Sequence, residues 1–214
     1  MRSVVAYVVG ALALGGVAQA QPAPLAPSKG YVEVVAQSAF GNVTSQSFGA
    51  EGGVTVAPHL QVFGEFGRVR DTSPESLGAG AQVIAGYLSR TQGGVTYGVR
   101  QPVTFGLGGV RYAFPSSRVE PYVLAGGGMA SVRREVTFTV GSTDVTSTLQ
   151  SLGVALGTDL SGSETKLMLS FGGGVAWPAW KQLVLDFQFR YGRILTEDQG
   201  TNVARAGLGI GVRF

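Results

Sequence analysis

The closing residues 204–214 read ARAGLGIGVRF. In this stretch every second residue is apolar: Ala204, Ala206, Leu208, Ile210, Val212 and Phe214. All of the residues between them are glycine or arginine. Because successive side chains of a β-strand point to opposite faces, this alternation gives one wholly apolar face and one face of glycine and arginine. The chain therefore ends in a predicted amphipathic β-strand.

The preceding segment divides its side chains in the same way. One face carries Leu183, Leu185, Phe187, Phe189 and Tyr191, and the other carries Val184, Asp186, Gln188, Arg190 and Gly192. Six more predicted strands are 31–40, 48–57, 60–70, 103–114, 121–132 and 166–177. Within 103–114 the apolar residues stand at odd positions up to Leu107 and at even positions from Val110 on. We therefore expect a β-bulge at Gly108 and Gly109. The segments together predict an all-β fold with eight antiparallel strands.

Residues 1–20 have the pattern of a secretory signal peptide. Arg2 precedes a long apolar run, and the tripeptide Ala-Gln-Ala at the end of the run has the small residues that signal peptidase accepts. The run is shorter than the roughly 20 apolar residues of a membrane-spanning helix. We therefore expect export with cleavage after Ala20, a proline-rich linker over 21–29 and one folded domain over 30–214.

The composition narrows the class of exported protein. The 214 residues include no cysteine, so a small disulfide scaffold and a thiolate metal site are both excluded. Glycine is unusually frequent, at 34 residues, without the repeat of collagen. We expect these glycines to allow close packing and bending of strands. A net charge of +3 is too small to indicate a nucleic-acid partner.

Two motifs carry a family resemblance. The amphipathic final strand, with Arg213 before a terminal Phe214, resembles the assembly signature of Gram-negative outer-membrane barrels. The sequence EPYVLAGGG at 120–128, which follows GVRY at 109–112, is similar to the central hairpin of the OmpA/OmpX-like and opacity-protein barrels. The resemblance implies a closed eight-stranded transmembrane β-barrel in the outer membrane. It also implies that Phe214 is an assembly signal and that the protein is a monomer. The implied partners are outer-membrane lipid, the barrel-assembly machinery and periplasmic chaperones.

The connections between predicted strands alternate in length. The short turns lie at Pro58, 115–118 and 178–181, and the longer loops are 41–47, 71–102, 133–165 and 194–201. Outer-membrane barrels have short periplasmic turns and longer outer loops, so the same alternation predicts which end faces the periplasm. A further hairpin hidden in a long loop would raise the strand number to ten.

Two of the long loops contain apolar residues at helical spacing. One set is Leu77, Ala81, Ile84 and Leu88, after an expected N-cap at Ser73, and the other is Val145, Leu149, Leu152, Leu156 and Leu160, after Asp144. An eight-stranded barrel is filled by its own side chains, so we expect two short amphipathic helices on or over the outer rim. Their apolar stripes could pack on each other, on the barrel mouth or on lipid headgroups.

Charged residues fall on the face of the strands opposite the apolar one. They are Glu33, Glu51, Glu65, Arg111, Asp186, Arg190 and Arg205, with Arg213 at the end of the chain. An isolated ion in a narrow lumen is too costly to keep, so these charges must be paired or hydrated. We expect an internal network that plugs the lumen. A narrow gated pore for small solutes, in which the pairs exchange, is the alternative.

Aromatic residues gather near the predicted periplasmic ends of the strands. They are Tyr112, Phe114, Tyr122, Trp177 and Trp180, with Phe214 at the terminus. Membrane barrels carry aromatic girdles at the boundary between lipid and water. This set is therefore the predicted periplasmic girdle, with ordinary core aromatics as the other interpretation.

Residues for catalysis or cofactor binding are scarce. His59 is the only histidine and falls in a predicted periplasmic turn, away from the outer-facing sites of barrel enzymes that act on lipid A. The triple glycines at 126–128 and 172–174 lack the lysine and hydroxyl residue of a phosphate loop. We expect no enzyme activity, no metal and no cofactor.

The functional expectation is a structural or surface-interaction protein with an adhesion-like role, by resemblance and elimination. A soluble periplasmic ligand-binding barrel of lipocalin type is the other rival, because strand alternation alone does not say which face is inside. In that rival Leu183 and Phe187 would be enclosed and the arginines would face water. The residues identify no extracellular ligand.

Overall fold

The computed structural model describes residues 28–195 and 200–214. Its elements in chain order are β1 (Gly30–Phe40), β2 (Ser45–Ala57), β3 (Leu60–Val69), α1 (Glu75–Leu88), β4 (Val95–Arg100), β5 (Val103–Ala113), β6 (Glu120–Val140), β7 (Thr143–Asp144), η1 (Thr146–Leu152), β8 (Gly162–Trp180), β9 (Leu183–Leu195) and β10 (Thr201–Arg213). The predicted signal peptide falls outside the described residues, as do all but the last two residues of the predicted linker.

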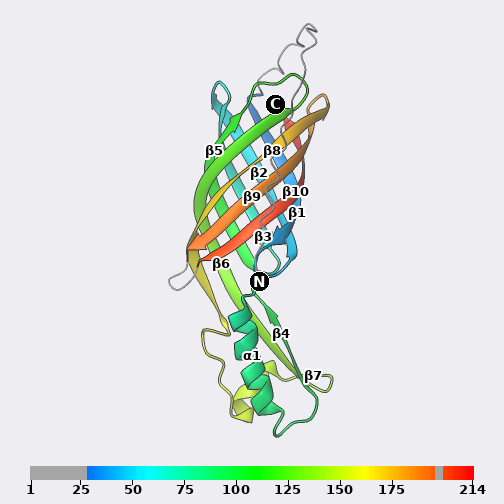
Figure 1. The fold of residues 1–214 in the computed structure, drawn as a ribbon, viewed down its shortest axis with the longest axis vertical. Coiled ribbons are helices and arrows are strands. Elements are labelled where there is room, and N and C mark those ends of the chain that lie inside the picture. Colours follow the sequence, from blue (N-terminus) through cyan, green and yellow to red (C-terminus); the bar gives the residue numbers. More distant parts are fainter. Residues whose placement is uncertain (1–27, 196–199) are drawn as a thin grey trace, which may run out of the picture.

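Eight of the strands form a closed antiparallel ring. Around the barrel the order is β1, β2, β3, β5, β6, β8, β9 and β10, and β10 pairs with β1 over ten residues to close it. Each ring strand runs antiparallel to both neighbours, so the chain winds around the barrel in tilted hairpins (Figure 1). The predicted eight-stranded barrel is confirmed.

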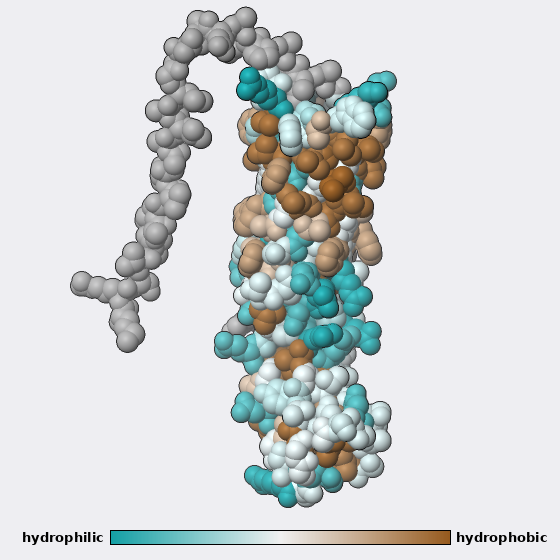
Figure 2. All heavy atoms as spheres, turned by 90° about the vertical axis from the view of Figure 1, so that its right-hand side faces the viewer, coloured by the Kyte–Doolittle hydropathy of each residue, from teal (hydrophilic) through white to brown (hydrophobic). Residues whose placement is uncertain are grey.

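The apolar face of the strands is the outer face of this barrel. Phe187 and Ile210 are 55% and 53% exposed, whereas Arg190 and Arg205 are fully buried. Figure 2 shows the apolar side chains as a band over the barrel half nearest the short turns. The faces are therefore opposite to those of a soluble lipocalin-type barrel, which would enclose its apolar side chains.

The predicted bulge at Gly108 and Gly109 is wrong. Both residues stay in uninterrupted register with β3 and with β6. Phe105 and Leu107 are buried inside the barrel while Val110 faces outward, so the change of apolar parity reflects an apolar stretch of lumen and not an extra residue. Register shifts occur instead beside the short turns, between Thr55 and Ala57 and between Pro178 and Trp180.

Beyond the barrel, the long loops build a compact extension that we call the loop lobe (residues 75–100 and 135–160). Strand β6 continues out of the barrel and pairs with β4 and β7, and α1 lies alongside β4 and the outer part of β6 (Figure 1). The hidden strand β4 therefore belongs to the lobe, and the ring keeps eight strands. The lobe has its own buried cluster: Leu77, Ala81, Ala85, Leu88, Val136, Phe138, Leu149 and Leu160.

Both predicted loop helices are present, with corrections at their ends. Helix α1 buries the predicted stripe except that Ala85 replaces Ile84 in the centre, and the predicted N-cap is wrong because Ser73 donates its hydroxyl to Asp71. The second helix is a 3-10 helix that ends at Leu152, where Gly153 adopts φ 78°. The apolar stripes of the two helices pack on each other and on the lobe strands.

At the start of η1, Asp144 accepts a hydrogen bond of 2.8 Å from the backbone N–H of Thr146. Hydrogen bonds from the side chain and the backbone of Thr146 hold the pKa of Asp144 below its usual value. The predicted N-cap at Asp144 is nevertheless wrong, because Val145 occupies the N-cap position and Asp144 lies one residue before it. None of the helices in the described part of the chain is long and apolar enough to cross a bilayer.

Candidate functional site

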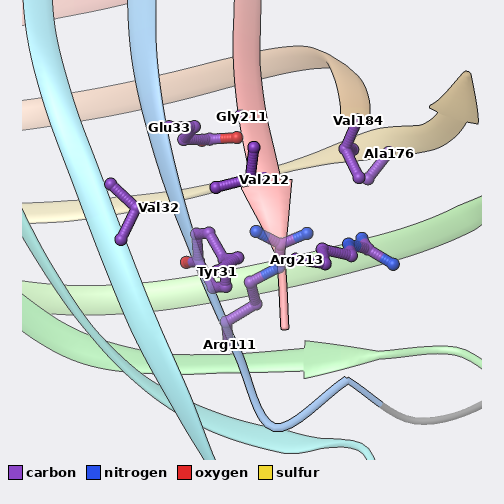
Figure 3. Close-up of a pocket in the computed structure, with 9 residues that line it drawn as sticks. All are labelled: Tyr31, Val32, Glu33, Arg111, Ala176, Val184, Gly211, Val212 and Arg213. Atoms are coloured by element: carbon purple, nitrogen blue, oxygen red, sulfur yellow. The ribbon is translucent and has the colours of Figure 1, made fainter. Parts of the chain in front are cut away.

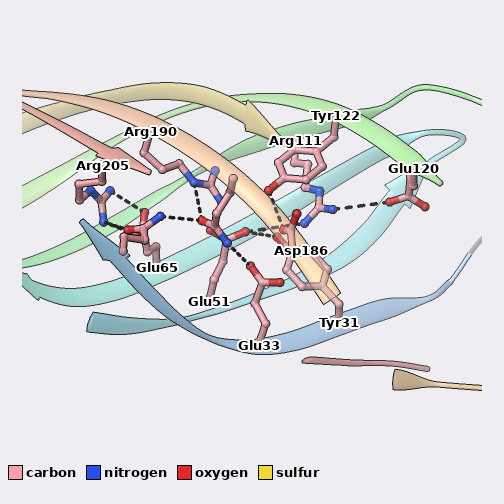
Figure 4. Close-up of polar contacts among 12 residues, drawn as sticks. Tyr31, Glu33, Glu51, Glu65, Arg111, Glu120, Tyr122, Asp186, Arg190 and Arg205 are labelled. Carbon is pink, nitrogen blue, oxygen red and sulfur yellow. Dashed lines mark hydrogen bonds and ion pairs between the residues drawn. The ribbon is translucent and has the colours of Figure 1, made fainter. Parts of the chain in front are cut away.

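The barrel lumen collects the charged residues of the inward strand faces. Glu33, Glu51, Glu65, Arg111, Asp186, Arg190 and Arg205 are all buried. They come from β1, β2, β3, β5, β9 and β10, and Figure 4 shows their side chains pointing toward one another across the barrel. Residues far apart in the chain thus form one polar layer, which we call the charge layer.

Two direct ion pairs lie at the centre of the charge layer. Arg190 Nη2 donates to Glu51 Oε2 at 2.6 Å, and Arg205 Nη1 donates to Glu65 Oε1 at 2.6 Å. A second contact of 3.3 Å makes the Arg205–Glu65 pair bidentate. Charge-assisted pairs of this geometry offset the loss of hydration that buried ions suffer.

Arg111 lies between two aromatic rings near the short turns. Its guanidinium carbon is 4.6 Å from the ring centre of Tyr31 and 3.6 Å from that of Tyr122, within the range of cation–π attraction. The same guanidinium reaches Glu51 at 3.9 Å and Glu120 at 3.6 Å. Arg111 therefore links the centre of the charge layer to its short-turn end.

Glu120 and Arg213 form an ion pair at that end of the lumen. Both nitrogens of the Arg213 fork donate to Glu120, each at 2.7 Å. The two side chains are partly exposed, at the short-turn end of the barrel where β6 begins and β10 ends. Sequence parity placed Arg213 on the inward face, but it did not identify Glu120 as the partner.

Neutral side chains complete the network. Gln188 accepts hydrogen bonds from Gln37 Nε2 and Arg190 Nε and donates to Glu33, each at 3.1 Å. Tyr31 donates to Glu51 at 2.5 Å, and Tyr122 donates to Asp186 at 2.6 Å. The sequence interpretation missed these residues as a group, although their inward parity on β1, β6 and β9 was a usable signal.

Glycine on the inward face of β10 makes room for the charge layer. A Cβ atom on Gly211 would lie 2.6 Å from Glu33 Cβ, and one on Gly209 would lie 3.1 Å from Glu33 Oε2. The Glu33 side chain therefore crosses β10 over these glycines to reach β9. Part of the glycine excess is explained by this close approach.

An apolar layer separates the charge layer from the long-loop end. Its members are Ala39, Val69, Val103, Phe105, Leu107, Ala130, Val132, Met168, Ile194 and Val203. All lie on the inward face of their strands near the long loops, and Phe105 stacks 4.4 Å from the guanidinium of Arg205. The sequence interpretation missed this layer because it assigned apolar residues to the lipid face.

Most predicted girdle residues face outward. Tyr112, Phe114, Trp177, Trp180 and Phe214 are exposed. Tyr122 is not part of the girdle, because it is 2% exposed inside the lumen, while its neighbour Val123 faces outward. The correction follows from strand parity: a residue at the right height belongs to the girdle only if its side chain points outward.

His59 occupies the turn between β2 and β3, with φ 66°, and its ring lies 6.2 Å from that of Tyr112. It is exposed, and the charge layer is inside the barrel. Over residues 28–195 and 200–214, no group of three histidine, cysteine or acidic side chains is placed to hold a metal ion.

Comparisons with known proteins agree with this geometry. A model of the family described as "Outer membrane protein beta-barrel domain" matches residues 9–214. The crystal structure of Neisserial surface protein A is similar, with a TM-score of 0.53 and 15% identity over 87% of this chain and 98% of that chain. No match was found among curated protein sequences.

Two further solved structures are similar at lower scores. Ail, the attachment invasion locus protein of Yersinia pestis, has a TM-score of 0.47 and 16% identity, over 87% of this chain and 97% of that chain. The N-terminal β-barrel domain of Pseudomonas aeruginosa OprF has a TM-score of 0.46 and 15% identity, over 88% and 100%. The family match spans nearly the whole sequence, and the chain therefore belongs to the outer-membrane protein β-barrel domain family.

Proposed function

We propose that this protein is a non-conducting outer-membrane barrel whose task is to hold the loop lobe at the cell surface. The single observation that carries the proposal is the presence of two buried layers of side chains in the lumen, the charge layer and the apolar layer. A barrel that gives no passage acts through what it displays. The lobe is what it displays, because it is a folded unit with its own buried cluster.

The direction of insertion is part of this proposal. The short turns and the C-terminus lie at one end of the molecule and the loop lobe at the other (Figure 1). Short turns face the periplasm in outer-membrane barrels. The lobe then lies outside the cell, and Tyr112, Phe114, Trp177 and Trp180 lie at the periplasmic boundary of the membrane.

Conductance measurements test the closed lumen. Purified protein in planar bilayers is expected to give no current steps at any voltage, because a path for ions must break buried pairs and also cross the apolar layer. Addition of the same volume of detergent buffer is the control. Regular current steps would overturn this part of the proposal and favour the narrow gated pore.

Excision of the lobe tests the surface role. The backbones of Thr72 and Gln101 are hydrogen bonded to each other, and Arg134 on β6 lies opposite Gly162 on β8 in the strand register. Residues 73–100 and 135–161 can therefore each be replaced by an Asn-Gly turn that joins the flanking residues. The trimmed barrel is expected to insert normally but to lose adherence of whole cells to immobilised matrix proteins and to other cells. Unchanged adherence would contradict a surface-interaction role.

Phe214 is proposed as the assembly signal. Its backbone carbonyl accepts hydrogen bonds from the N–H groups of Lys29 and Gly30, at 2.6 and 3.0 Å, and its ring faces outward. Phe214→Ser is expected to reduce the membrane yield severalfold, because the assembly machinery would fail to engage the last strand. Val212→Ser, an equally outward position on the same strand, is the matched control. Equal yields of the two variants would contradict the assigned role.

A further inference from the structure

We propose that the native barrel holds one bound proton at neutral pH, on the buried carboxyl pair Glu33 and Asp186. The buried charged side chains are four carboxylates and three guanidiniums, so the fully ionised charge layer would carry a net charge of −1. The pair at the mouth, Glu120 and Arg213, is neutral by itself. An uncompensated charge in a lumen surrounded by lipid is too costly to keep.

The ion pairs show which carboxyls have no cation of their own. Arg190 pairs with Glu51, and Arg205 pairs with Glu65. Arg111 contacts Glu51 and Glu120. Throughout the described residues, no basic nitrogen lies within the 4.0 Å ion-pair distance of Glu33 or Asp186. The excess negative charge therefore belongs to these two.

The two carboxyls are neighbours across β10. Asp186 pairs in register with Gly209, and the space beside Gly209 is occupied by Glu33 Oε2 and by Gln188 Nε2. Gln188 Nε2 donates to Glu33 Oε1 at 3.1 Å. Asp186 is fully buried, and its Oδ1 atom accepts no hydrogen bond from any described residue. One proton on the pair removes the repulsion between the two carboxylates.

Figure 3 shows a small space beside Glu33 on the side of the short turns, lined also by Arg111, Gly211 and Arg213. Its volume is about 10 Å³, which is near the minimum that holds one water molecule. The apolar layer closes the opposite side. We therefore expect protons to reach the pair from the short-turn end.

The charged and titratable groups around the pair come from every element that faces it. They are Tyr31 on β1, Glu51 on β2, Glu65 on β3, Arg111 on β5, Glu120 and Tyr122 on β6, Arg190 on β9, and Arg205 and Arg213 on β10. Strand β8 contributes only Ser170 and Ala176 among its buried side chains on this stretch. These groups are common to the wild type and to a Glu33→Gln variant. A comparison of the two proteins therefore isolates the effect of the proton on the pair.

Linkage between protonation and folding tests the proposal. In the unfolded chain both carboxyls are ionised above about pH 5, so unfolding releases one proton. The unfolding equilibrium constant of the wild type should then rise about tenfold more per pH unit than that of Glu33→Gln, until the native pair loses its proton. Stability thus falls with rising pH in the wild type relative to the variant. Urea unfolding in lipid vesicles over pH 5–9 measures this difference, and equal slopes would overturn the proposal.

Infrared spectroscopy provides a second readout that needs no unfolding. The folded wild type at pH 7 should show the carbonyl band of a protonated carboxylic acid. Both Glu33→Gln and Asp186→Asn should remove the band, because the three buried carboxylates that remain are balanced by the three buried arginines. Glu164→Gln, at the long-loop mouth where Glu164 pairs with Arg134, should leave the band unchanged. A wild type without the band, whose stability instead depends on sodium against choline as the salt cation, would mean that a metal cation neutralises the pair.

Discussion

Replacing Arg205 by leucine should lower the free energy of unfolding by about 3–5 kcal/mol, the range for removal of one partner from a buried ion pair. Arg205 is fully buried and holds Glu65 with two hydrogen bonds, at 2.6 and 3.3 Å. Leucine fits the adjoining apolar layer but leaves the Glu65 carboxylate without its arginine. Urea unfolding in lipid vesicles, followed by the fluorescence of Trp177 and Trp180, measures the change.

The double substitution Glu65→Leu and Arg205→Leu is the matched control. Because replacement of a whole buried pair by apolar residues is often neutral or stabilising, the double variant should recover most of the lost free energy. A loss below about 1 kcal/mol for Arg205→Leu alone is the size expected of an exposed pair. That result would show that water reaches Glu65, and it would contradict the filled lumen.

Replacing Phe138 by alanine should destabilise the loop lobe by about 3–5 kcal/mol, the usual loss for a buried phenylalanine. Phe138 is fully buried in the lobe cluster between α1 and η1. The barrel does not depend on this side chain, so we expect the lobe alone to open. Protease digestion of intact cells should then cut within residues 75–100 and 135–160, while the barrel keeps its heat-dependent shift in gel mobility.

Thr137→Ala is the control for this variant, because the neighbouring Thr137 side chain is exposed on the other face of β6. It should leave the lobe resistant to protease. If Phe138→Ala also abolished the gel shift, the lobe and barrel would unfold together and the separate stability of the lobe would be refuted. Resistance of Phe138→Ala to protease would show that the cluster does not hold the lobe together.

The corrections share one physical cause. Strand parity says which residues share a face, but the composition of each face changes along the barrel. Phe105 and Leu107 fill the lumen near the long loops, where the sequence interpretation expected lipid-facing residues and so placed a bulge. Tyr122 faces inward at a height where other aromatics face lipid. Both errors came from assuming that apolar and aromatic side chains of a strand always point outward.

The loop lobe shows the same limit at a larger scale. Helical spacing predicted α1 and the start of η1, because that signal is local. The length of β6, its pairing with β4 and the end of η1 at Leu152 depend on contacts between segments more than thirty residues apart. Apolar side chains in loops can satisfy several arrangements, and only the packed lobe selects one.

By itself the sequence determined eight strands and the two faces of each, because strand alternation is a local property of the chain and the final strand displays it in full. The closed barrel with its apolar face outward was implied by the family resemblance, because alternation does not say which face is inside. The same alternation placed the residues of the charge layer on one face. Tertiary structure alone decided which charges pair, that no basic group among the described residues forms an ion pair with Glu33 or Asp186, and that an apolar layer covers the network. Those outcomes depend on the strand register around the ring, which brings together side chains that are distant in the sequence.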